Sequence, residues 1–133
     1  MKTNQFIIEK PSRFGMDQTV DILVNTAIQK GWSHLATHDL QHSLEKSGKK
    51  VRPVKVIEIC KPDYSGNMLE KNDERIMSVL MPCRVSVYMK DDGKVYVALL
   101  NTAMLAAYMP VAIAKAMTGA ADESFEIAQK VLA

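Results

Sequence analysis

The sequence predicts an α+β fold, in which one domain over residues 1–133 packs helices against one face of an antiparallel sheet. Three observations support this class. Apolar residues recur at helical spacing through residues 16–28. Through residues 81–101, apolar and polar residues alternate on both sides of a glycine turn. An apolar stretch then follows at residues 102–118. A chain of 133 residues is long enough to bury one substantial core, which makes a single domain the natural expectation.

The first elements are expected to be a short strand at residues 6–9 and a helix that starts near Met16. Pro11 and Gly15 supply the turn between them, and Gly31 is well placed just beyond the last helical turn. The helix has an apolar face made of Met16, Val20, Leu23, Val24, Ala27 and Ile28.

A second strand is expected at residues 33–37, followed by a short helix that Asp39 caps and Gly48 ends. Residues 51–60 are rich in β-branched side chains, with apolar residues at both odd and even positions. That pattern predicts an interior strand covered on both sides.

The clearest signal is a β-hairpin with strands at residues 83–89 and 95–99. A two-residue loop would place Met89 opposite Tyr96. A three-residue loop at 91–93, with Gly93 left-handed, instead pairs Met89, Val87 and Val85 with Val95, Val97 and Leu99. The second register puts both apolar sets on one face, so it is the one we predict.

The remaining segments are less regular in the sequence. Residues 61–80 are expected to form an irregular excursion with one helical turn. Residues 102–118 should form two short helices, with Pro110 as the first residue of the second, and Asp122 should cap a final helix. The predicted order is a strand, a helix, four strands and then helices.

Composition excludes several functions. Seventeen basic and fifteen acidic residues leave a net charge of +2, without a basic run, which argues against nucleic-acid binding. The N-terminal apolar patch is too short for a signal peptide or a membrane anchor, so a cytoplasmic location is expected. Nucleophile-elbow, phosphate-loop and dinucleotide motifs are absent, and no reaction or cofactor is therefore predicted.

Two cysteines form a candidate site. Cys60 ends one predicted strand and Cys83 begins another, so antiparallel pairing would bring both sulfurs to the same end of the sheet. The functional interpretation is a redox couple or a soft-metal site that Met81 assists, with Arg84 lowering the pKa of a neighbouring thiol. The structural interpretation is that both cysteines are small core residues.

Three histidines recur at four-residue spacing, which on one helix would place three metal ligands on one face. A strand followed by a helix capped at Asp39 instead puts His34 and His38 on one strand face and His42 on a helix surface. No metal site is predicted, and His38, Cys60 and Cys83 are the weak candidates.

Three segments carry a family resemblance: residues 31–40 (GWSHLATHDL), 56–69 (VIEICKPDYSGNML) and 81–101 (MPCRVSVYMKDDGKVYVALLN). Together with the helix start at 18–20, they resemble a cysteine-bearing branch of the bacterial domain-of-unknown-function family 302. The resemblance implies a TATA-binding-protein-like fold and homodimers. It implies neither DNA binding nor a particular reaction.

Two main hypotheses follow. The first is a cytoplasmic homodimeric domain that holds a small apolar ligand between the sheet and the 102–118 helices, or acts purely as an assembly module. The alternative is a thiol-based redox or soft-metal protein that uses Cys60 and Cys83.

Overall fold

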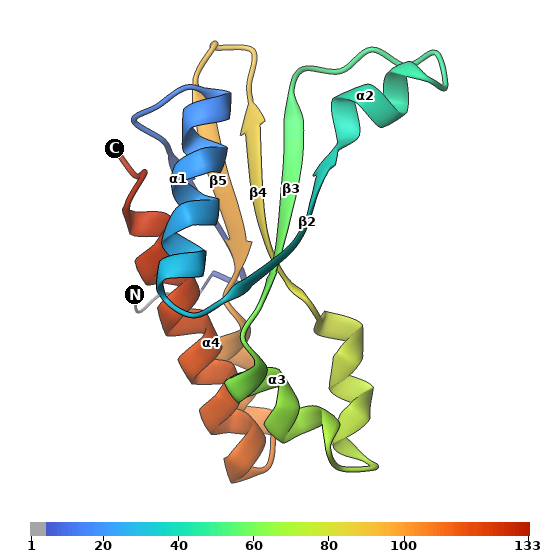
Figure 1. Cartoon of the computed structure of the whole chain (residues 1–133), viewed down its shortest axis with the longest axis vertical. Helices are drawn as coiled ribbons and strands as arrows, with labels where there is room; N and C mark the ends of the chain where they lie inside the picture. Colours follow the sequence, from blue (N-terminus) through green and yellow to red (C-terminus); the bar gives the residue numbers. More distant parts are fainter. Residues whose placement is uncertain (1–4) are drawn as a thin grey trace.

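The fold is a five-stranded antiparallel sheet with helices on one face, as the sequence predicts (Figure 1). The computed structural model describes residues 5–133, so the first four residues of the N-terminal segment lie outside the described part. The strand order is β1-β5-β4-β3-β2. The strands are β1 (Ile7–Pro11), β2 (Ser33–Asp39), β3 (Val54–Cys60), β4 (Cys83–Met89) and β5 (Val95–Leu100). The α-helices are α1 (Met16–Gln29), α2 (Leu40–Glu45), α3 (Pro62–Leu69) and α4 (Val111–Gln129). Two 3₁₀ helices, η1 (Glu74–Leu80) and η2 (Thr102–Tyr108), complete the structure of the described residues.

The hairpin of β4 and β5 adopts the predicted register. Val85 pairs with Leu99, Val87 with Val97, and Met89 with Val95. Gly93 takes a φ of 78°, the left-handed conformation that the three-residue loop requires. The apolar side chains of both strands therefore face the helices together.

Helices α1 and α4 lie against this apolar face and form the main core (Figure 1). Gly31 closes α1 in a left-handed conformation, at φ 86°. Asp39 caps α2, because its carboxylate accepts the backbone N–H of His42 at 3.0 Å. The predictions for these two helix ends are confirmed.

Several element boundaries differ from the predicted ones. Strand β1 lies one to two residues later than expected, and β3 begins at Val54 because Arg52 and Pro53 remain outside the ladder. Strand β3 is interior, as predicted, but only one of its faces is covered. Ile57 and Ile59 are buried beneath the helices, whereas Val56 is only partly buried on the open face.

The 61–80 excursion is more helical than expected, whereas the two helices expected within 102–118 are present as η2 and the first part of α4. The excursion at 61–80 contains α3, with Pro62 in its first turn, and then η1. The predicted break at Asp122 is wrong, since α4 runs without interruption to Gln129 with Asp122 exposed on its surface. Buried residues continue at helical spacing across that position, so packing holds the helix together. Pro110 is the N-cap rather than the first helical residue.

The lower part of α4 extends beyond the sheet and packs with α3 and η2, and α3 in turn contacts η1 (Figure 1). A second apolar cluster fills this helical layer, with Met68, Met77, Ile113, Ala116 and Met117 at its centre. The two clusters meet where the sheet ends. None of the helices in residues 5–133 combines the length and apolar character that a bilayer crossing needs.

Candidate functional site

A pocket lies at the junction between the end of the sheet and the helical layer. Its cavity volume is about 50 Å³, within an open space of about 480 Å³ that includes solvent at the mouth. The lining residues come from β3, α3, η1, β4, η2 and α4, together with the turn after α1. They are Trp32, Cys60, Lys61, Tyr64, Ser65, Met68, Met77, Leu80, Met81, Pro82, Cys83, Thr102, Met117 and Ala120.

Both cysteines line this pocket. Antiparallel pairing of β3 with β4 places Cys83 opposite Ile59, so the cysteines lie at the same end of the sheet. Both are free and partly buried, and the Cys60 Sγ atom lies 3.2 Å from the Ser65 hydroxyl oxygen. Burial, followed by the nearby Cys60 sulfur, raises the pKa of Cys83 to about 11. The Cys83 thiol is therefore protonated near neutral pH.

Four methionines complete a sulfur-rich lining. Met81 precedes Cys83, whereas Met68, Met77 and Met117 come from α3, η1 and α4. Only Met81 is singled out by the sequence. The other three are scattered along the chain, and the nine methionines in the composition are the one sequence signal that points toward them.

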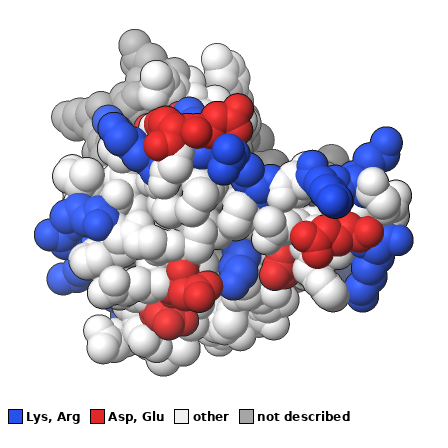
Figure 2. Space-filling view, turned by 90° about the horizontal axis from the view of Figure 1, so that it is seen from above, with Lys and Arg blue, Asp and Glu red and all other residues white. Residues whose placement is uncertain are grey.

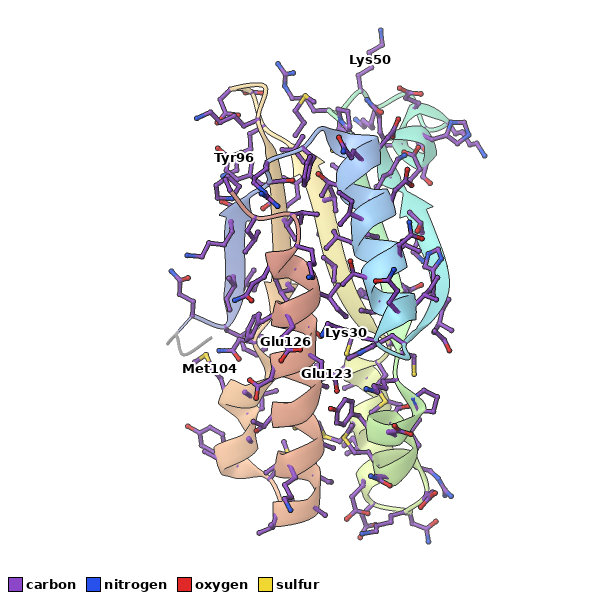
Figure 3. The ribbon with its side chains drawn as sticks, turned by 60° about the vertical axis from the view of Figure 1, so that its left-hand side comes forward. Lys30, Lys50, Tyr96, Met104, Glu123 and Glu126 are labelled. Atoms are coloured by element: carbon purple, nitrogen blue, oxygen red, sulfur yellow. The ribbon has the colours of Figure 1, made fainter. Side chains whose placement is uncertain are left out.

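A hydrogen-bonded network borders the pocket around Glu123 of α4. Its carboxylate accepts from Lys61 Nζ at 2.7 Å, from Trp32 Nε1 at 3.2 Å and from the Tyr64 hydroxyl. Figure 3 shows Glu123 on the side of α4 that faces α1 and α3. The Lys61 and Glu123 side chains are only 18% and 19% exposed, so this ion pair is shielded from solvent.

The network changes the acidity of its members. Burial alone would raise the pKa of Glu123, but the hydrogen bonds from Lys61, Tyr64 and Trp32 outweigh burial and lower it. The hydrogen bond to Glu123, aided by burial, raises the pKa of Tyr64 to about 12. Glu123 thus remains ionised and Tyr64 remains a donor at neutral pH. Sequence analysis missed both residues, because their partners are about 60 or more positions distant.

Arg84 and His38 lie outside this pocket. Arg84 is on the open face of the sheet, where its side chain is 64% exposed and its Nε atom lies 3.5 Å from Glu58. His38 contacts the same carboxylate from β2. Arg84 therefore has an acidic partner of its own, and neither side chain lines the pocket that holds the cysteines.

The prediction that His34 and His38 share a strand face is wrong. The β2 register shifts between His34 and Ala36, so that His34 pairs with Ile59 and His38 with Val56, which point to opposite sides of β3. In residues 5–133, no group of three or more histidine, cysteine, aspartate or glutamate side chains could hold a metal ion.

The surface carries charges of both signs. On the end of the molecule seen in Figure 2, acidic and basic side chains are interspersed, with most acidic groups next to basic ones. Among the described residues, Lys90 pairs with Glu9 and Arg52 pairs with Asp91, each at 2.7 Å. The visible face offers no extended single-sign patch of the kind that attracts a phosphate backbone.

Comparison with known proteins identifies the family. The family model described as "Domain of unknown function DUF302" matches residues 8–133. No curated protein matches the sequence. A crystal structure of an uncharacterized conserved DUF302 protein from Bacillus stearothermophilus has a TM-score of 0.84 at 19% identity, covering 96% of this chain and 98% of that one. The chain belongs to the DUF302 family of domains of unknown function.

Proposed function

We propose that the protein binds a small, predominantly apolar molecule in the pocket at the end of the sheet. The observation that carries this proposal is the lining itself, in which apolar and sulfur-containing side chains surround a single charged residue, Lys61. The charge of Lys61 is offset by Glu123 at 2.7 Å. A pocket of this kind favours apolar ligands.

The polar groups at the border support a ligand with one polar end. Ser65 and Thr102 present hydroxyl groups, and Lys61 can offer further N–H donors beside its bond to Glu123. A few polar groups in an apolar pocket orient a ligand. The proposal is close to the sequence-based one, because Thr102 and Met117 place the pocket beside the 102–118 segment.

Trp32 provides a direct assay, since it is the one tryptophan of the sequence and it lines the pocket. We expect iodobenzene to quench Trp32 fluorescence in a saturable way, because the heavy iodine atom would lie next to the indole ring. The variant Ala120→Met should fill the pocket and abolish saturable quenching. Ala112→Met, on an exposed position of the same helix, is the matched control. Linear, unsaturable quenching of the wild-type protein would contradict the proposal.

A redox role for the two cysteines has weaker support. Thiol chemistry needs a thiolate, and burial raises the pKa of Cys83 to about 11.

Free thiols do fit a reducing compartment, so the cytoplasm is the location we propose.

We further propose that a second copy of the chain covers the open face of the sheet. Val56, Ser86 and Ala98 form a row of small side chains across this face, and Ile7 at its edge is 63% exposed. Acidic and basic groups lie on the same face, so two copies related by a twofold axis could pair opposite charges.

Sedimentation equilibrium tests the homodimer. The wild-type chain should sediment as a dimer at micromolar concentrations, and Ala98→Arg should shift it to a monomer. Lys130→Ala, at an exposed position beyond the end of α4, is the control and should leave the dimer intact. A wild-type monomer, or a dimer that survives Ala98→Arg, would refute this arrangement.

A further inference from the structure

Six of the fourteen residues that line the pocket carry sulfur, five of them from five different elements and Met81 from the link between η1 and β4. Several sulfur atoms lie between the lower part of α4 and α3 in Figure 3. Met68, Met77 and Met117 also belong to the second apolar cluster, so the pocket lies where this sulfur-rich core borders both cysteines. The six residues are Cys60, Met68, Met77, Met81, Cys83 and Met117.

We propose that this pocket binds a soft monovalent cation, with copper(I) as the natural candidate, through a cysteine thiolate and methionine thioethers. The inference concerns the same pocket as the proposed function and assigns it a different class of ligand. Thiolate and thioether sulfur select copper(I) over harder cations. No carboxylate or imidazole lines the pocket, so it lacks the ligands that calcium or magnesium would need.

Charge balance favours a monovalent ion. One thiolate and one copper(I) ion form a neutral unit, and the thioethers add ligands without adding charge. A neutral unit avoids the cost of leaving a net charge in an apolar pocket. The thiol proton passes to solvent when the copper–sulfur bond forms, and the copper does not change its oxidation state.

Zinc fits the same residues less well. Structural zinc sites use four cysteine, histidine or carboxylate ligands. The pocket offers two cysteines and no histidine or carboxylate among its lining residues. Lys61 is the one charged residue of the lining, and its pairing with Glu123 reduces the repulsion that a cation would otherwise meet.

Competition with a chromogenic copper(I) chelator, under oxygen-free reducing conditions, tests the inference. We expect the wild-type protein to take one copper(I) per chain from the chelator. Met81→Leu and Met117→Leu, which keep approximate side-chain volume, should each weaken binding by more than about tenfold. The matched control is Met104→Leu. Met104 is exposed on η2, lies on the far side of α4 from α3 and is not part of the lining (Figure 3).

Titration with iodobenzene on the same samples separates the two proposals. Copper(I) binding that depends on the pocket methionines and blocks iodobenzene binding supports both the soft-cation site and the apolar-ligand pocket. Failure to bind copper(I), or binding that both methionine variants leave unchanged, overturns the soft-cation site, while saturable iodobenzene quenching would still support the pocket. Methionine-dependent copper(I) binding without iodobenzene binding would support the cation site and refute the apolar ligand. Circular dichroism of each variant verifies that it is folded.

Discussion

The ring of Tyr64 on α3 occupies the space where Gly119 on α4 lacks a side chain. A β-carbon at position 119 would lie 2.6 Å from Tyr64 Cε1, closer than real β-carbons approach other atoms. The missing side chain lets Tyr64 reach Glu123 one turn further along α4, and it brings the Tyr64 ring to 6.2 Å from that of Trp32. This glycine thus acts through packing, in the middle of a helix where glycine is otherwise unfavourable.

Replacing Gly119 with alanine should push Tyr64 away from Glu123. We expect the pKa of Tyr64 to fall from about 12 toward the ordinary value of 10, because its hydrogen bond to the carboxylate raises it. The helix gains about 1 kcal/mol from alanine, whereas the lost Tyr64 hydrogen bond to a charged carboxylate costs about 1.5–3 kcal/mol, so the free energy of unfolding should fall by up to about 2 kcal/mol. NMR titration of labelled tyrosines measures the shift, with Tyr64→Phe assigning the signal. An unchanged pKa would contradict the packing argument.

Glu123 should make stability depend on acidic pH. The folded state lowers the pKa of Glu123 below its ordinary value of 4.5, so its contribution to stability is present above the unfolded pKa and disappears as pH falls through the folded pKa. Glu123→Gln should cost about 1.5–3 kcal/mol at neutral pH, because hydrogen bonds to a charged group are lost. Upon acidification, the unfolding free energy of the Glu123→Gln variant should fall less than that of the wild-type protein.

Urea unfolding of both proteins at a series of pH values provides that comparison. The two stability curves should converge at acidic pH, where the wild-type carboxylate becomes protonated. Parallel curves across the whole range would show that Glu123 has the same pKa in both states.

Cys83 should react slowly with iodoacetamide in the folded chain. A pKa of about 11, compared with an ordinary value of 9.0, means about 100-fold less thiolate at pH 8. The variant Cys60→Ser leaves Cys83 as the single thiol, and mass spectrometry follows its alkylation with and without urea. Equal rates in the folded and unfolded chains would contradict the burial of Cys83.

Two neighbouring isoleucines of β1 test which face of the sheet is covered. Ile8 is 1% exposed and Ile7 is 63% exposed. Ile8→Ala should lower the free energy of unfolding by about 2–5 kcal/mol, because it leaves a cavity in the core. Ile7→Ala should change the free energy of unfolding of the monomer by less than about 0.5 kcal/mol. Equal losses from chemical denaturation would mean that the two faces are equally buried.

Local patterns predicted the parts of the fold that depend on short-range chemistry. The hairpin register followed from alternation of apolar residues and from Gly93, and the α2 cap followed from Asp39. The family resemblance, carried mainly by residues 56–69 and 81–101, agreed with the fold that these patterns indicate. The false break at Asp122 has the opposite cause, since a capping residue type lies inside a helix that packing holds together.

The candidate site was only partly predictable. Antiparallel pairing explains why Cys60 and Cys83 line one pocket, and both positions were visible in the sequence. The contact of Glu123 with Tyr64 and Lys61 depends on how α3 packs against α4, which no periodicity encodes. The split of His34 from His38 required a register shift that has no clear sequence signature.

A crystal structure of the protein soaked with iodobenzene would test the central proposal most directly. We predict anomalous scattering from one iodine per chain, located between Trp32, Met81 and Met117 at the end of the sheet. Iodine found only on the outer surface, or a pocket closed by its own side chains with no iodine inside, would contradict the proposed function.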